Sequence, residues 1–196
     1  MSIFVENALW MSFNIALALF AVLAGWIAMN SRQIIFKIIF GLLWLIFLPN
    51  TIYILTDIIH LIKQINLVSN FEVFLLIIQY LLFLTIGALT FIYGVYPLEG
   101  FLSYYIHKRL LRRTLIIILI FLISFGVILG RMHRLNSWDI IFNFQKLTAD
   151  IFTTLTSLEL IVLIILFGII GNLIYFLLRE KVFSFTNNFI KVKISK

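Results

Sequence analysis

The sequence predicts an all-α fold, a polytopic transmembrane helical bundle of about five spans, and three observations support this. Hydrophobic residues make up 63% of the 196 residues and charged residues only 12%, with a mean hydropathy of +1.15. Five apolar segments approach the roughly 20 residues with which a helix crosses the hydrocarbon core. Basic residues gather in alternate connections between those segments. We expect residues 1–196 to form a single transmembrane domain in a multi-pass protein of the cell membrane.

The first span is expected over residues 8–29. No positively charged segment precedes it, and its apolar run is longer than that of a signal peptide, so we expect it to remain as an anchor. Three later segments, 71–96, 110–129 and 158–178, are also apolar enough to cross the membrane. The chain has no cysteine, which excludes disulfides and thiolate metal sites.

The second span, expected over residues 34–56, contains Pro49. A helix that ended at Leu48 would be about 22 Å long, too short for a hydrocarbon core of about 30 Å. We favour a helix that kinks at Pro49, where a backbone N–H is missing, and continues to the far interface. A re-entrant turn after Asn50 is the alternative, and both place Asp57 and His60 at the same membrane face.

Charge distribution predicts the orientation, with the N-terminus outside and the C-terminus cytoplasmic. The outer segments then hold Lys63, Arg131, Arg134 and Lys146. The cytoplasmic segments hold Arg32, Lys37, Lys108, Arg109, Arg112, Arg113, Arg179, Lys181, Lys191, Lys193 and Lys196. The net charge of +7 is then explained by topological anchors that meet anionic lipid headgroups. Membrane lipids are therefore the expected partners, and nucleic acid is not.

Two connections are expected to form interfacial helices. Residues 97–113 begin with Pro97, which suits a helix start, and alternate apolar with basic positions, so we expect a separate helix on the cytoplasmic surface. Residues 140–155 carry apolar side chains at helical spacing and are expected on the outer surface.

The first candidate site lies on the second span, where Tyr53, Asp57 and His60 follow one stripe of a helix. Asp57 and His60 are three positions apart, close enough to hydrogen-bond. An ionisable residue near membrane depth is costly and marks a candidate functional site. Asn50 precedes this stripe by one turn.

The second candidate site follows the fourth span, where Arg131 and Arg134 are also three positions apart and precede Asn136 and Asp139. The expected topology puts both groups on the extracytoplasmic side. We therefore expect Asp57 and the two arginines to converge in one site.

Structural roles compete with this interpretation. Asn136 and Asp139 resemble a helix N-cap with an acid in the first turn. Asp57 could pair with an arginine only to fix the helix arrangement. Asp57, His60, His133 and Asp139 have acceptable metal-ligand chemistry but no spacing signature, so no metal or cofactor is expected.

The two groups also resemble a known family. The first motif consists of Leu48-Pro49-Asn50, Tyr53, Thr56-Asp57 and His60-Leu61. The second consists of Gly130-Arg131, Arg134 and Asn136-Ser137-Trp138-Asp139. This pair of motifs resembles the bacterial membrane family known as domain of unknown function 1361, over most of the chain. In that family a second proline often follows Leu-Pro-Asn, and a tryptophan often precedes Asn-Ser-Trp-Asp. Here Thr51 or Ile52 and Leu135 occupy those places. The family name carries no activity.

The leading functional hypothesis is an extracytoplasmic site that binds or processes an anionic or lipid-linked substrate. Asp57, helped by His60, would act as general base, and the arginines would grip anionic oxygens. The expected binding residues are Asn50, Tyr53, Arg131, Arg134, Asn136 and Asp139. A non-catalytic assembly or partner subunit is the alternative, and a transport component ranks lower because polar residues in the spans are sparse. Whether the protein is an enzyme stays open.

Overall fold

Five long apolar helices confirm the predicted fold class. The computed structural model describes residues 2–194, without the side chains of 141 and 186–194, so the charged groups of Lys191, Lys193 and Lys196 lie outside the described part. The candidate spans are Ile3–Asn30, Ile34–Leu67, Asn70–Tyr105, Arg109–His133 and Leu158–Phe185. Their number, length and composition make the chain a multi-pass membrane protein.

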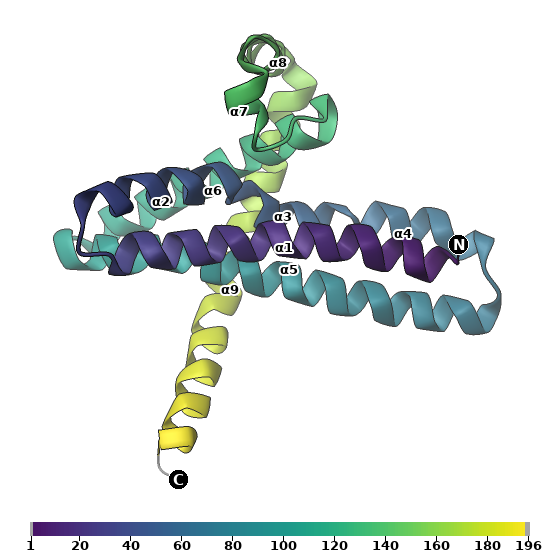
Figure 1. Cartoon of the computed structure of the whole chain (residues 1–196), viewed down its shortest axis with the longest axis horizontal. Coiled ribbons are helices and arrows are strands. Elements are labelled where there is room, and N and C mark those ends of the chain that lie inside the picture. Colours follow the sequence, from purple (N-terminus) through teal and green to yellow (C-terminus); the bar gives the residue numbers. More distant parts are fainter. Residues whose placement is uncertain (1, 195–196) are drawn as a thin grey trace.

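The helices form a layer that a last helix crosses (Figure 1). In chain order they are α1 (Ile3–Asn30), α2 (Ile34–Phe47), α3 (Pro49–Thr56), α4 (Ile58–Gln64), η1 (Ile65–Leu67), α5 (Asn70–Tyr105), α6 (Arg109–His133), α7 (Asp139–Phe142), α8 (Phe144–Thr156) and α9 (Leu158–Ile194). Helix α1 lies against α2, α3 and α5, and α6 packs mainly on α9. In the view of Figure 1, α9 crosses the direction of α1 steeply, and α7 and α8 lie at the top.

The second span is interrupted twice but keeps its direction. Leu48 has helical dihedrals (φ −56°, ψ −36°) and its N–H donates to the Trp44 carbonyl at 2.8 Å. Pro49 has no N–H to continue that pattern, so α2 ends and α3 begins there. A second break falls at Asp57 (φ −76°, ψ −4°). In Figure 1, α2, α3 and α4 follow one another in one direction, as in a kinked helix rather than a re-entrant turn.

Small residues allow the helices to approach closely. Ala18, Ala21 and Ala24 of α1 are buried against their neighbours. A Cβ atom added to Gly126 of α6 would lie 2.6 Å from Cγ of Pro49, so only glycine admits the proline ring there. This contact brings the start of α3 against α6 and sets the position of the residues described below.

The main core lies where α3, α5, α6 and α9 meet. Its fully buried members include Ile52, Phe91, Ile120 and Tyr175. A second buried cluster joins α1, α3 and α5. Ile52 and Ile54 are two positions apart and point to opposite sides of α3, so this helix is buried between the two clusters.

The predicted separate helix over residues 97–113 is wrong. Helix α5 runs through the buried Pro97 to Tyr105, and α6 begins at Arg109. Leu98 and Leu102 pack against the main core, so these apolar positions serve tertiary packing and not an interface. Membrane helices tolerate an internal proline where neighbours compensate for the lost hydrogen bond. The predicted helix over 140–155 is confirmed as α7 and α8, with a break at 143.

Candidate functional site

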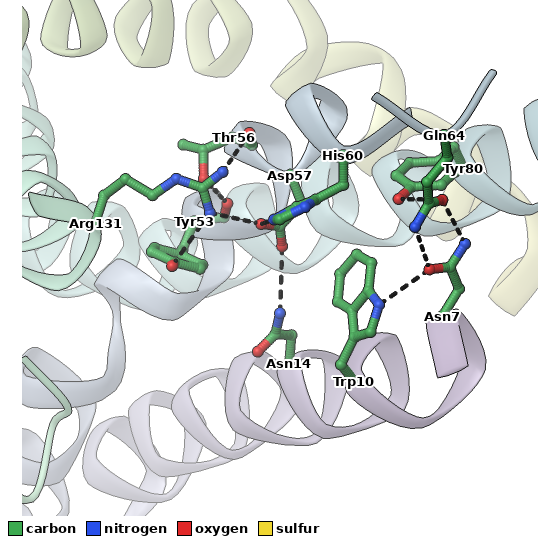
Figure 2. Close-up of polar contacts among 10 residues, drawn as sticks. All are labelled: Asn7, Trp10, Asn14, Tyr53, Thr56, Asp57, His60, Gln64, Tyr80 and Arg131. Atoms are coloured by element: carbon green, nitrogen blue, oxygen red, sulfur yellow. Dashed lines mark hydrogen bonds and ion pairs between the residues drawn. The ribbon is translucent and has the colours of Figure 1, made fainter. Parts of the chain in front are cut away.

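Asp57 and Arg131 form an ion pair that joins three helices (Figure 2). The Arg131 Nη1 donates to Asp57 Oδ1 at 2.9 Å and to the Tyr53 hydroxyl at 3.3 Å. Nη2 of Arg131 reaches the Thr56 carbonyl at 3.4 Å. From α1, the Asn14 side-chain amide donates to Asp57 Oδ2 at 3.2 Å. The carboxylate is only 3% exposed, and these donors compensate for its burial.

The break between α3 and α4 positions this carboxylate. Asp57 is the single residue between the two helices, and its side chain lies within reach of Arg131 near the end of α6. Tyr53, one turn earlier, places its ring 5.5 Å from the Arg131 guanidinium carbon, a cation–π distance. The predicted stripe of Tyr53 and Asp57 therefore faces the predicted arginine.

His60 lies close to this pair without joining it. Its Nε2 is 3.8 Å from Asp57 Oδ1, beyond hydrogen-bonding distance. The imidazole ring instead lies beside Trp10, with ring centroids 5.6 Å apart. With 45% of its side chain exposed, His60 is accessible to a ligand where Asp57 is not.

A cavity of about 640 Å³ lies beside the ion pair; we call it the arginine cavity, after Arg131 and Arg134. Its basic lining groups are these two arginines, Lys63 and His60, and no carboxylate of the described residues lines it. The neutral polar lining residues are Asn14, Asn50, Tyr53, Asn136 and Ser137. Apolar side chains complete the wall, among them Phe13, Leu17, Ile46, Trp138 and Ile140.

Arg134 stands at the rim of the arginine cavity in an uncommon backbone conformation. It ends α6 with φ 54° and ψ 37°, the left-handed region that non-glycine residues rarely adopt. Its side chain is exposed and has no ion-pair partner within the described part of the chain. Strained backbone of this kind persists where the surroundings hold it in place.

The loop after α6 connects the two motifs. The Asn50 side-chain amide donates to the Ser137 hydroxyl at 3.0 Å, and that hydroxyl donates to the Ile46 carbonyl at 3.3 Å. These bonds hold residues 134–138 over the break at Pro49. The two motifs are therefore in direct contact.

Asp139 faces its own loop and does not line the arginine cavity. Its carboxylate accepts the backbone N–H of Asn136 at 2.7 Å and the side-chain amide of Asn143 at 2.5 Å. These donors hold the pKa of Asp139 below its ordinary value, with the Asn136 amide the larger cause. Asp139 is the acid in the first turn of α7, as the structural alternative predicted, whereas the predicted N-cap at Asn136 is wrong, because Trp138 precedes α7 and Asn136 bonds the Asp139 carboxylate through its backbone N–H.

His133 belongs to a separate cluster. Its Nδ1 is 3.3 Å from Asp150 Oδ1 and its Nε2 is 3.0 Å from the hydroxyl of the buried Thr154. The cluster fastens α8 to the end of α6 and lies apart from Asp57. Among the described residues, no three His, Asp or Glu side chains are grouped so that they could hold a metal ion.

The structure brings together most, but not all, of the predicted site residues. Asn50, Tyr53, His60, Arg131, Arg134 and Asn136 line the arginine cavity, whereas Asp57 and Asp139 do not. Sequence reasoning did not place Lys63, Asn14 or Ser137 in this site. Asn14 could have been found as a lone amide within an apolar span, and Lys63 as a cation one turn beyond His60.

A comparison of the sequence with protein families gives a match to the family described as Protein of unknown function (DUF1361), over residues 12–174. This chain belongs to the DUF1361 family. The matched region runs from α1 into α9, so it includes both motifs and the arginine cavity of this DUF1361 member. No curated protein and no solved structure matches the chain.

Proposed function

We propose that the arginine cavity binds the anionic headgroup of a lipid or of a lipid-linked molecule. One observation carries this proposal: Lys63, His60 and two arginines line the cavity, and no described carboxylate does. Guanidinium groups suit phosphate and carboxylate oxygens because their N–H groups form a planar fork. A neutral ligand would leave the charges of Arg134 and Lys63 uncompensated.

The cations have different roles in this proposal. Arg131 is already balanced by Asp57 and donates to Tyr53 and Thr56, so it would offer a ligand only the N–H groups that these contacts leave free. Arg134 and Lys63 are exposed and would supply the charge that balances the ligand. The side-chain amide of Asn136 adds a hydrogen-bonding group at the wall, whereas the amide nitrogen of Asn50 already donates to Phe47 and Ser137.

The apolar wall supports an amphiphilic ligand. Phe13 and Leu17 of α1 and Ile46 of α2 line the same cavity as the cations, and the helices that carry them are membrane spans. A headgroup at the arginines would therefore have an apolar surface beside it for the attached chain. A soluble anion would gain nothing from that surface.

Asp57 serves in this proposal as a positioning residue, because it is covered by Arg131 and Asn14 and does not touch the cavity. His60 is the remaining candidate for a general base. The hydroxyl of Ser137 is engaged with Asn50 and Ile46, so no lining serine is paired with a base. We therefore propose binding and assign no reaction.

The proposed location is the extracytoplasmic face of the cell membrane. The basic residues Arg32, Lys37, Lys108 and Arg109 lie at the start of α2 and α6, and the cavity lies near the opposite ends of these spans. Positive residues favour the cytoplasmic side. This distribution supports a cavity that faces outward.

An assembly role is the second candidate, because the Asp57–Arg131 pair also resembles a clamp. It ties α1, α3 and α6 together whether or not a ligand binds. In that case substitution of Arg134 would leave lipid binding unchanged and would weaken only the binding of a protein partner.

Native mass spectrometry of the detergent-purified protein tests the proposal. We expect a discrete anionic adduct on the wild type that is lost from Arg134→Ala. Arg113→Ala removes the same charge from the other end of α6 and should keep the adduct. Equal bulk lipid on all three proteins would overturn the proposal and favour the assembly role.

A further inference from the structure

A second hollow lies at the opposite end of the spans. This groove, of about 450 Å³, is formed by the end of α1, by α2 and by the end of α5. Gly25 and Met29, Lys37 and Gly41, and Pro97 and Phe101 line it from the three helices in turn. We call it the Lys37 groove.

Trp44 forms a fixed wall of the Lys37 groove. Its indole Nε1 donates to the Gly94 carbonyl of α5 at 2.8 Å. A Cβ atom on Gly25 would lie 2.5 Å from the Trp44 ring, so glycine lets the ring lie against α1. The indole is therefore held from two sides and cannot swing in to fill the groove.

The space itself remains open at Gly41. A Cβ atom added to Gly41 meets no other atom within 4 Å, although the residue lines the groove. The neighbouring Ile34 and Ile38 are 67% and 55% exposed on a membrane-spanning helix. Hydrocarbon is the solvent of such a surface, so an apolar chain is the natural occupant.

Positive charge stands at the mouth of the groove. Lys37 is the only charged lining residue, it is exposed, and it has no ion pair within the described part of the chain. Arg32 and Lys108 lie in the two connections that flank the lining segments. Glu99 lies in the same stretch of α5 but is bound by Arg179 and Tyr175 instead.

We infer that the Lys37 groove binds one acyl chain of an anionic phospholipid, with the phosphate at Lys37. Charge complementarity identifies the headgroup, because the cations at the mouth have no described carboxylate beside them. The apolar walls of the groove indicate that an acyl chain occupies it. Each basic residue near an anionic membrane surface contributes about 1 kcal/mol, a change in affinity of about fivefold.

This site is independent of the arginine cavity. Lys37 of the groove and Lys63 of the arginine cavity are 26 positions apart on the second span, about 39 Å of helical rise. The two sites share no lining residue. Loss of one leaves the other in place.

Native mass spectrometry with defined lipids tests this inference on the full chain. Phosphatidylglycerol and phosphatidylcholine with identical acyl chains are titrated in turn onto the detergent-purified protein. We expect the first phosphatidylglycerol to bind about fivefold more tightly than phosphatidylcholine. In an Arg134→Ala background, where the arginine cavity has lost a headgroup cation, Lys37→Gln should abolish that preference, and Gly41→Phe should weaken both lipids by filling the groove. Gly41→Ala in the same background serves as the control and should keep the preference.

Equal binding of the two lipids to the wild type would overturn the inference. So would unchanged binding to a Gly41→Phe variant that unfolds at the wild-type temperature. A wild-type dimer that Gly41→Phe abolishes, with lipid binding unchanged, would assign the groove to a second copy of the chain.

Tryptophan fluorescence gives a test that does not depend on the folding of Gly41→Phe. Phosphatidylglycerol with brominated chains should quench Trp44, seen as the difference between the wild type and Trp44→Phe. Brominated phosphatidylcholine should quench it less at equal concentration. Equal quenching by both lipids would contradict the proposed headgroup selectivity.

Discussion

Asp57 accepts hydrogen bonds from two helices at once, and this explains how a carboxylate can be buried in an apolar bundle. Arg131 reaches it from α6 and Asn14 from α1. A buried ion pair adds little net stability, but removal of one partner leaves an uncompensated charge. The pair therefore specifies which helices lie together at this level of the membrane.

Replacement of Asp57 by asparagine should destabilise the protein. Arg131 is 20% exposed and would lose its counter-charge, so we expect the free energy of unfolding to fall by about 3 kcal/mol. Asn14→Ala removes only one interhelical hydrogen bond and should cost about 0.6 kcal/mol. Unfolding in detergent, followed by circular dichroism, measures both. An Asp57→Asn variant as stable as the wild type would show that the pair does not hold the helices.

At the scale of the element, α8 is fastened to α6 around His133, whose ring contacts Asp150 and Thr154 and whose carbonyl accepts Lys146 Nζ at 3.3 Å. Thr154 is buried, its hydroxyl lies 3.0 Å from His133 Nε2, and Asp150 lies beside the other ring nitrogen. The adjacent Thr153 is exposed and bonds only its own helix. Two neighbouring threonines thus differ in one contact with the rest of the molecule.

Hydrogen exchange across residues 144–156 should distinguish these threonines. Thr154→Ala removes the contact with His133, worth about 1 kcal/mol, so local opening of α8 should become about fivefold more frequent. Thr153→Ala should leave the exchange rates near those of the wild type. If the two variants exchange alike, the cluster does not anchor α8.

The amphipathic pattern of residues 97–113 shows what an element's sequence leaves undecided. Leu98 and Leu102 have the spacing of a helix that lies on a membrane surface, and the same spacing suits a helix that packs on a core. Only the contacts of this segment with α6 and α9 show that it packs on the core and does not lie on a membrane surface. The course of the second span was easier to predict from the sequence, because the thickness of the hydrocarbon core required the helix to continue past Pro49.

At the scale of the whole molecule, hydropathy was sufficient to predict the all-α bundle and its five spans. Topology also brought Tyr53 and Arg131 into contact, as expected from their shared membrane face. Pairing of Asp57 with an arginine was among the alternatives, but the sequence could not show that the pair keeps this carboxylate out of the arginine cavity. The local role of Asp139 was among the alternatives because its helix-start pattern is short-range.

The orientation of the molecule can be measured directly because the chain has no cysteine. The positive-inside rule predicts that Lys63 faces outward and Arg113 faces the cytoplasm. In intact cells, a membrane-impermeant maleimide should label Lys63→Cys and leave Arg113→Cys unlabelled. Both should react after permeabilisation. The reverse pattern would place the arginine cavity on the cytoplasmic side.

The close approach of Pro49 to Gly126 has an evolutionary consequence. A side chain at position 126 would collide with the proline ring, so Gly126 cannot change freely while Pro49 is kept. Pro49 belongs to the first motif and Gly126 lies one turn before the second. Descendants of a common ancestor that keep Pro49 should therefore also keep Gly126.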